Sequence, residues 1–151
     1  LRLVGSEMCI RDSWYADEGC NYKYSGKMLE RNNWHPTLLE IKSSIEFITS
    51  QKYNSVLANY YRDGSDSMGW HSDDESMLDK DSAIASVSLG QERPLHFKHK
   101  NQDISFAIDQ SHGSVIVMDG DTQKYWKHCI KKSKKLMKPR LNLTFRTIIT
   151  A

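Results

Sequence analysis

Two side chains at neighbouring alternate positions, His71 and Asp73, are the first candidates for chemistry in this sequence. They follow a β-rich stretch that ends near Tyr61 and a turn over Asp63–Gly69. On an extended segment, residues i and i+2 point to the same side. One imidazole and one carboxylate can therefore reach a single metal ion together, and a distant histidine would complete a three-ligand site with open coordination positions.

Four histidines compete for the third position. His96 and His99 lie in a lysine-rich hairpin, where a solvated role is expected, and His112 precedes a glycine and resembles a turn residue. His128 lies in a predicted strand twelve residues before Arg140, and we choose it. Two imidazoles and one carboxylate suit non-haem Fe(II), although H-x-D alone is a weak signal and a lone histidine is by default a core residue.

The most specific pattern is a polar alternation near the C-terminus. As a strand, this run presents Leu141, Leu143 and Phe145 on one face. The other face carries two guanidinium groups, an amide and a hydroxyl, from Arg140, Asn142, Thr144 and Arg146.

That polar face indicates a buried anion, because a guanidinium fork binds a carboxylate in two places. 2-Oxoglutarate carries two carboxylates, and Asn59 and Tyr61 can add hydrogen bonds from another strand. The alternative is an ordinary strand with a solvated polar face; the nearby metal motif favours the diacid.

One helix and many short strands must position these residues. Leu38, Ile41, Ile45 and Ile48 recur at helical spacing and predict a helix over Pro36–Thr49 with a core-facing stripe. The predicted strands cover 55–61, 83–89, 95–98, 104–108, 115–118, 125–130 and 141–149, separated by turn signals that include Asp119-Gly120. Short strands at such spacing predict a sandwich or barrel.

At this point the chain resembles the AlkB family of DNA and RNA dealkylating dioxygenases, from about Trp14 to Ile149. The resemblance rests on Asn59-Tyr60-Tyr61, the run His71–Glu75, the segment Ile84–Gly90, His112-Gly113-Ser114, His128, and the run Arg140–Arg146. The H-x-D-D-E sequence resembles the eukaryotic-type DNA repair homologues more than the founding bacterial enzyme.

The resemblance implies a mainly β (α+β) fold, a double-stranded β-helix or cupin-like jelly roll with a flanking helix. It implies that Fe(II) is held by His71, Asp73 and His128. It implies that 2-oxoglutarate is bound by Asn59, Tyr61, Arg140, Asn142, Thr144 and Arg146, with the arginines on its carboxylates in an order left open. O2 is the second cosubstrate, and the implied products are a repaired base, succinate, CO2 and an aldehyde.

Substrate contacts are expected around an extended segment upstream of the helix. Tyr24 is expected to stack on an extruded base opposite the ring edge of His71. The other expected substrate contacts are Tyr22, Ser25, Asp74, Glu75 and Trp14, and the alternative for the tyrosines is ordinary packing. The expected phosphate contacts are Lys127, Lys131, Lys132, Lys134 and Lys135, although charge runs are usually solvated.

Length and composition favour one soluble globular domain. The chain has 151 residues, a net charge of +2, and no apolar run near the ~20 residues of a membrane span. Residues 1–13 resemble translated sequencing-adapter text and are expected to be a non-native, poorly packed leader before a single dioxygenase domain over 14–151. Family members carry a larger N-terminal region, so the resemblance implies an N-terminally truncated chain.

Three scattered cysteines form no disulfide pattern and indicate a reducing intracellular compartment, the nucleus in a eukaryote or the cytoplasm in a bacterium. The expected partner is alkylated DNA or RNA, bound by a monomer without a membrane. Two other functions stay open: a 2-oxoglutarate-dependent hydroxylase of a protein or small molecule, and a non-enzymatic jelly-roll binding module.

Overall fold

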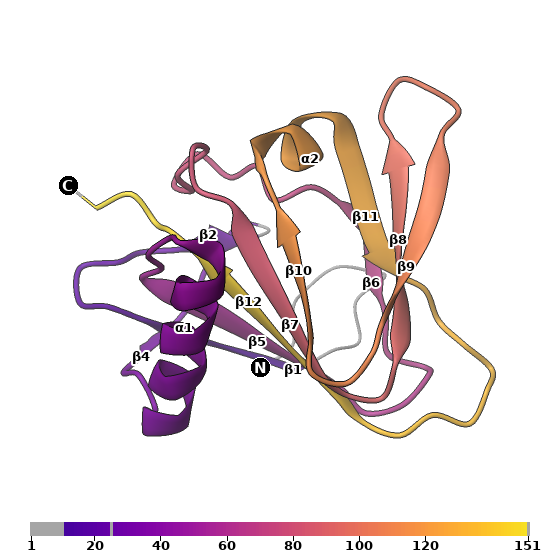
Figure 1. The fold of residues 1–151 in the computed structure, drawn as a ribbon, viewed down its shortest axis with the longest axis horizontal. Coiled ribbons are helices and arrows are strands. Elements are labelled where there is room, and N and C mark those ends of the chain that lie inside the picture. The colour runs from indigo at the N-terminus through magenta and orange to yellow at the C-terminus, as the bar shows by residue number, and fades with distance from the viewer. Residues whose placement is uncertain (1–10, 25, 151) are drawn as a thin grey trace.

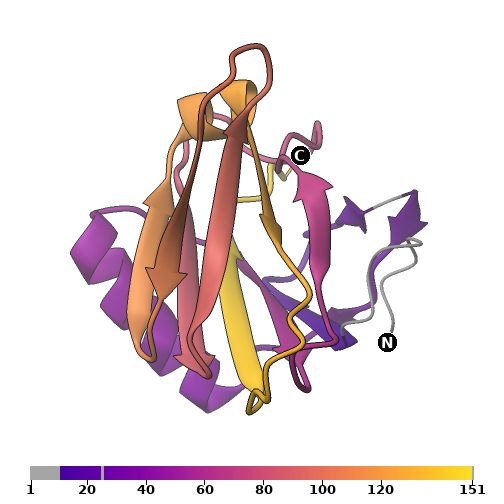
Figure 2. The same ribbon diagram turned by 90° about the vertical axis from the view of Figure 1, so that its right-hand side faces the viewer.

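The computed structural model describes residues 11–24 and 26–150, which form two facing β-sheets with a long helix outside one of them (Figure 1). Figure 2, turned by 90°, looks onto the four-stranded sheet, with the helix behind it. This arrangement confirms the predicted jelly-roll class with a flanking helix. No helix in the described part of the chain is both long and apolar enough to cross a membrane.

The larger sheet has six strands in the order β10-β7-β12-β5-β1-β4. Their bounds are β10 Ser114–Met118, β7 Ile84–Gly90, β12 Arg140–Arg146, β5 Ser55–Tyr61, β1 Arg11–Ala16 and β4 Arg31–Asn32. The last strand of the chain, β12, therefore lies in the middle, between β7 and β5. This position buries the polar run from Arg140 to Arg146 at the centre of the molecule.

The smaller sheet has four strands in the order β6-β11-β8-β9. Their bounds are β6 Met68–His71, β11 Trp126–Ile130, β8 Arg93–His99 and β9 Ser105–Gln110. A separate two-stranded hairpin, β2 (Lys23–Tyr24) with β3 (Lys27–Met28), lies beside them. The sequence predicts an extended segment at this hairpin. It does not predict the strands β1, β4 and β6 or the short helix α2 (Gly120–Tyr125).

Strand alternation gives the larger sheet two different buried faces. Leu141, Leu143 and Phe145 pack outward against a cluster that includes Ile45 of the helix. The opposite face of β12 points into the space between the sheets, where Leu57 of β5 and Ile84 of β7 belong to a second cluster. Apolar residues therefore anchor the sheet to the helix, and its inner face is free to carry polar groups.

Helix α1 spans Pro36–Thr49, as predicted. His35 caps its N-terminus by accepting a hydrogen bond from the Thr37 N–H, and proline suits the first turn. The prediction that the whole apolar stripe faces the core is wrong at its last residue, because Ile45 is buried but Ile48 is 65% exposed.

Three other expectations need correction. Residues 11–13, assigned to the poorly packed leader, form the start of β1 and pair with β5; the rest of that segment lies outside the described residues. The last strand ends at Arg146, and Ile148 forms only an isolated bridge with Leu78. Asp119-Gly120 is the start of helix α2, in which Asp119 is the N-cap, not a hairpin turn.

Candidate metal and cosubstrate site

Strands β6 and β11 bring two histidines into direct opposition. His71 and His128 are cross-strand partners, and their ring centres are 4.3 Å apart. A bulge between His128 and Ile130 lies next to this pair. Asp73 follows the end of β6, and its carboxylate oxygens lie 3.8 Å from His71 Nε2 and 3.9 Å from His128 Nε2.

These three residues fit a metal ion. Their ligand atoms all lie within 4.8 Å of one another, a distance at which no direct hydrogen bond joins them but an ion can sit between them. The backbone oxygen of Gly69 accepts from His71 Nδ1 at 2.7 Å, which directs the lone pair of Nε2 toward Asp73. His71, Asp73 and His128 are the group that the sequence predicted.

The protonation states suit metal binding. Burial would raise the pKa of Asp73, but Arg146, His128 and His71 outweigh it and lower that pKa to about 2. Burial, with a smaller contribution from His71, lowers the pKa of His128 to about 4. At neutral pH the site therefore offers an ionised carboxylate and a neutral imidazole, the forms that bind metals.

Arg146 connects this centre to the polar face of β12. Its Nη2 lies 3.2 Å from Asp73 Oδ1, and the side chain is buried. Burial disfavours its charge, yet Asp73 and the neighbouring tyrosines raise the pKa of Arg146 above its usual value. Arg146 Nε is a buried donor with no partner among the described residues.

Arg140 lies at the other end of β12 among polar side chains. Its Nε donates to Ser88 Oγ at 2.9 Å, Nη2 donates to the side-chain oxygen of Gln110, and its guanidinium lies 4.9 Å from the Tyr61 ring centre. Burial lowers the pKa of Arg140, although Tyr61 opposes the shift. No carboxylate in the described part of the chain pairs with it, and its Nη1 has no partner.

The two arginines border one cavity between the sheets. The predicted cosubstrate residues Asn59, Tyr61, Asn142 and Thr144 line it together with both arginines and the three candidate metal ligands. Buried polar groups without partners are rare, but here Asn59 Oδ1, Arg140 Nη1 and Arg146 Nε are all unpaired in the described residues. The two guanidinium donors fit a small dianion bound next to a metal, and Asn59 Oδ1 adds an acceptor to the wall.

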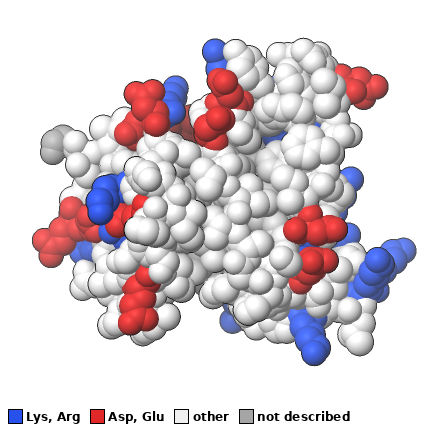
Figure 3. Space-filling model, in the orientation of Figure 1, with Lys and Arg blue, Asp and Glu red and all other residues white. Residues whose placement is uncertain are grey.

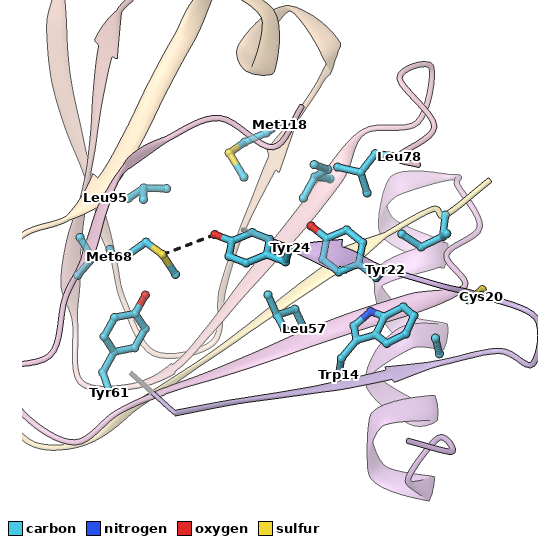
Figure 4. Close-up of a cluster of buried hydrophobic side chains, with 14 of the residues drawn as sticks. Trp14, Cys20, Tyr22, Tyr24, Leu57, Tyr61, Met68, Leu78, Leu95 and Met118 are labelled. Carbon is cyan, nitrogen blue, oxygen red and sulfur yellow. Dashed lines mark hydrogen bonds between the residues drawn. The ribbon is translucent and has the colours of Figure 1, made fainter. Parts of the chain in front are cut away.

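The expected base-stacking tyrosine also lines this cavity. Figure 4 shows Tyr24, Tyr22 and Trp14 in a row, with the Tyr24 hydroxyl directed toward Met68. Tyr22 and Trp14 are 0% and 2% exposed and stack on one another at 5.7 Å. Neither Tyr22 nor Trp14 lines the cavity, and their expected contact with a substrate stays a prediction. Ser25 lies outside the described residues.

An acidic groove adjoins the metal centre. Asp74 and Glu75 line it, as does Asp73. Tyr22 donates a hydrogen bond to Glu75 Oε1 at 3.3 Å, and burial raises the pKa of this glutamate. Both carboxylates therefore share the lining of one groove with the candidate metal ligand Asp73.

The five predicted phosphate-contacting lysines are all exposed. Lys127 lies on β11, and the others lie on the loop that joins β11 to β12 (Figure 1). Figure 3 shows basic side chains at the lower right, where this loop projects. The Ser133 N–H donates to Gly64 O at 2.8 Å, so the middle of the loop is fastened to the turn after β5.

Sequence reasoning missed four polar residues at the site. Ser86, Ser88 and Gln110 support Arg140 and Asn142, and Gln123 on α2 accepts from the Asp73 N–H. The alternation of serine with apolar residues in the predicted strand over 83–89 was a signal for the first two. Gln110 and Gln123 had none, because only the fold brings them near β12 and β6.

Comparison with known proteins identifies this combination. Residues 4–146 match the family model described as the 2OG-Fe(II) oxygenase superfamily. The chain belongs to this superfamily. The chain is 40% identical over 146 residues to the alpha-ketoglutarate-dependent dioxygenase alkB homolog 3 of Bos taurus. The alignment covers 90% of this chain and 50% of that relative. It is 37% identical over 147 residues to the DNA oxidative demethylase ALKBH2 of Homo sapiens, covering 92% and 56%.

A plant relative extends the similarity over nearly the whole chain. The DNA oxidative demethylase ALKBH2 of Arabidopsis thaliana is 33% identical over 179 residues, covering 99% of the chain and 57% of the relative. The chain thus spans about half the length of the curated relatives it matches. These matches confirm the predicted resemblance to the AlkB family.

A solved structure supports the fold. The structure of OsALKBH1 superposes with a TM-score of 0.69 at 21% identity, covering 96% of this chain and 81% of that one. At this identity the superposition supports the shared jelly-roll architecture only.

Proposed function

We propose that this chain is the catalytic part of an Fe(II)- and 2-oxoglutarate-dependent dioxygenase that removes small alkyl groups from N-alkylated bases in DNA or RNA. The observation that carries the proposal is the convergence of His71, Asp73 and His128 within 4.8 Å beside a cavity lined by two buried arginines. The superfamily match and the names of the curated relatives support it.

In this proposal His71, Asp73 and His128 hold Fe(II). Bound iron with 2-oxoglutarate and O2 would supply the oxidation of an alkyl carbon, with release of succinate and CO2 and then loss of an aldehyde from the base. The residues of the chain provide the geometry: the Gly69 carbonyl orients the His71 ring, and Arg146 keeps the Asp73 carboxylate ionised.

The two arginines take different ends of 2-oxoglutarate. Arg146 is 3.2 Å from the metal ligand Asp73, so it faces the end of the cosubstrate that lies at the metal. Arg140 lies with Tyr61 and Gln110 at the far end of β12, and its unpaired Nη1 donates to the distal carboxylate. Asn59, Asn142 and Thr144 complete the wall with hydrogen-bonding groups.

Tyr24 supplies an aromatic face to an extruded base, since it lines the same cavity as His71. Asp74 and Glu75 favour a lesion whose alkylation makes the base cationic, because both carboxylates border the adjoining groove. The exposed lysines of the β11–β12 loop contact phosphates of the strand that carries the lesion. We also propose that the protein is a monomer in a reducing compartment. The free thiols of the buried Cys20 and Cys129 support the reducing compartment.

The test is product analysis on a panel of alkylated DNA and RNA oligonucleotides with Fe(II) and 2-oxoglutarate. We expect an alkylated oligonucleotide to stimulate succinate release and to yield an aldehyde and the unmodified base. Succinate release that responds to a peptide or small molecule but to no oligonucleotide would overturn the nucleic-acid assignment. An absence of any 2-oxoglutarate turnover by metal-loaded protein would overturn the enzymatic one.

A further inference from the structure

The backbone of Asp73 has an unusual anchor. Strand β6 ends at His71, so the Asp73 N–H has no place in the β-ladder. It donates instead to the side-chain oxygen of Gln123, 2.8 Å away and fifty residues later in the chain. Both residues are buried, at 4% and 7% exposure.

Gln123 is itself held in place by its surroundings. It lies on helix α2, whose N-cap Asp119 accepts from the Thr122 N–H at 3.1 Å. The Gln123 carbonyl accepts from Lys100 Nζ at 3.0 Å, and its side-chain amide contacts Met118 Sδ at 3.8 Å. Contacts at the backbone carbonyl and at the side-chain amide of Gln123 therefore fix the oxygen that accepts from Asp73.

The hydrogen bond bears directly on the candidate metal ligands. The Asp73 carboxylate has to face Nε2 of both histidines at once. A hydrogen bond to the backbone N–H of the same residue fixes the direction in which this side chain leaves the main chain. Ser72 adds a second attachment by donating to Trp126 O at 2.6 Å. Partners that orient metal ligands typically change metal affinity by roughly 10–100-fold when they are removed.

We infer that Gln123 is a positioning residue for the metal centre, acting through the Asp73 backbone to hold its carboxylate opposite His71 and His128. The inference rests on the proposed metal site. It assigns a role in the centre to helix α2, which otherwise only joins β10 to β11.

The alternative role of Gln123 is to fasten helix α2 without affecting the metal. Gln51 is a matched control, because its side-chain oxygen also accepts from a backbone N–H, that of Ala83, at 2.9 Å. Gln51 lies after helix α1 and lines neither the cavity nor the acidic groove. Gln51→Leu therefore removes the same kind of hydrogen bond, together with one from Ser82 Oγ at 3.1 Å, away from the metal centre.

The experiment measures anaerobic Fe(II) and Co(II) affinity, the Co(II) absorption spectrum, and the melting temperature of the metal-free protein. Gln123→Leu should weaken metal binding by roughly 10-fold or more and alter the Co(II) spectrum, by the precedent for such orienting partners. Gln123→Glu keeps an acceptor and should stay closer to wild type than Gln123→Leu. Gln51→Leu should lower the melting temperature without changing either metal readout.

Wild-type metal affinity and spectrum in folded Gln123→Leu would overturn the inference, as would equal effects of Gln123→Leu and Gln51→Leu on affinity. If Gln123→Leu does not fold, Gln123→Asn withdraws the amide by one methylene, and the same loss or retention of affinity decides. Failure of the wild-type protein to bind either metal would instead count against the proposed function, so the two failures are distinguishable.

Discussion

His71 and His128 are direct partners in the antiparallel pairing of β6 with β11. The ladder itself therefore sets the spacing of the two imidazoles, and Asp73 needs only to turn back toward them after β6 ends. A site built on paired strands is held more rigidly than one built on loops. Substitutions at the ligands should accordingly affect metal binding more than folding.

His71→Ala should abolish metal binding and 2-oxoglutarate turnover, because it removes one of three ligands. The side chain is 20% exposed, so the fold should survive. Calorimetry with Fe(II) and an assay of succinate release are the measurements. His112→Ala is the control, since His112 accepts from the Gly90 N–H at a turn and does not line the cavity; retained turnover in His71→Ala would show that the metal site is misassigned.

Arg140→Lys should raise the 2-oxoglutarate KM by roughly 100-fold while keeping the positive charge, because an ammonium cannot reproduce the guanidinium fork. The measurement is succinate release as a function of 2-oxoglutarate concentration. Arg31→Lys, at a guanidinium that donates to Ala16 O far from the cavity, should leave KM unchanged. An unaltered KM in Arg140→Lys would show that the distal carboxylate of 2-oxoglutarate does not bind Arg140.

Gly90→Ala should destabilise the protein by more than the ~1–2 kcal/mol of the left-handed conformation alone. Gly90 has φ of +90° at the end of β7, and an added Cβ would lie 2.6 Å from Pro139 O, next to Arg140. Gly113 has φ of +80° with open space around it, so Gly113→Ala isolates the conformational cost. Chemical denaturation of both variants gives the comparison, and equal losses would contradict the steric argument.

Replacing Lys132 and Lys135 together with glutamate should weaken oligonucleotide binding and reduce its salt dependence. Each lost phosphate contact should lower the slope of log K against log salt by roughly 0.7–0.9. Turnover of 2-oxoglutarate without oligonucleotide should not change. Lys52→Glu is the control, because Lys52 lies near helix α1 and pairs with Glu46. An unchanged slope in the double variant would show that the loop does not contact the oligonucleotide.

Asp66→Asn should destabilise the protein at pH 7 and progressively less as pH falls. Hydrogen bonds from Arg62 hold the pKa of Asp66 below its usual value, although burial opposes them. A lowered pKa in the folded state stabilises above the unfolded pKa of about 3.9 and loses that contribution as pH falls through the folded value. Urea denaturation of both proteins at pH 7 and pH 3 tests this, and a constant difference would contradict it.

Much of the fold could be predicted from periodicity. The helix Pro36–Thr49 and the polar alternation of Arg140–Arg146 were confirmed because each has a strong repeat and packs one apolar face on the core. Strands of two residues, such as Lys23–Tyr24, have no period to detect, and α2 was hidden by a glycine that also suits a turn.

The site was predictable where its chemistry was local in sequence. Asp73 follows His71 by two positions, and Arg140 and Arg146 share one strand face. His128 was chosen among four histidines on weaker grounds, and its pairing with His71 supplies the reason that the sequence lacked. The burial of Tyr22 and Trp14 depends on their packing against residues far away in the chain, which no local pattern encodes.

The ion pair of Arg146 with Asp73 has a consequence for biogenesis. An isolated carboxylate in the interior would be costly until a cation arrived, but here the neutralising guanidinium comes from the chain itself. Neutralising the Asp73 charge during folding therefore does not depend on a bound cation.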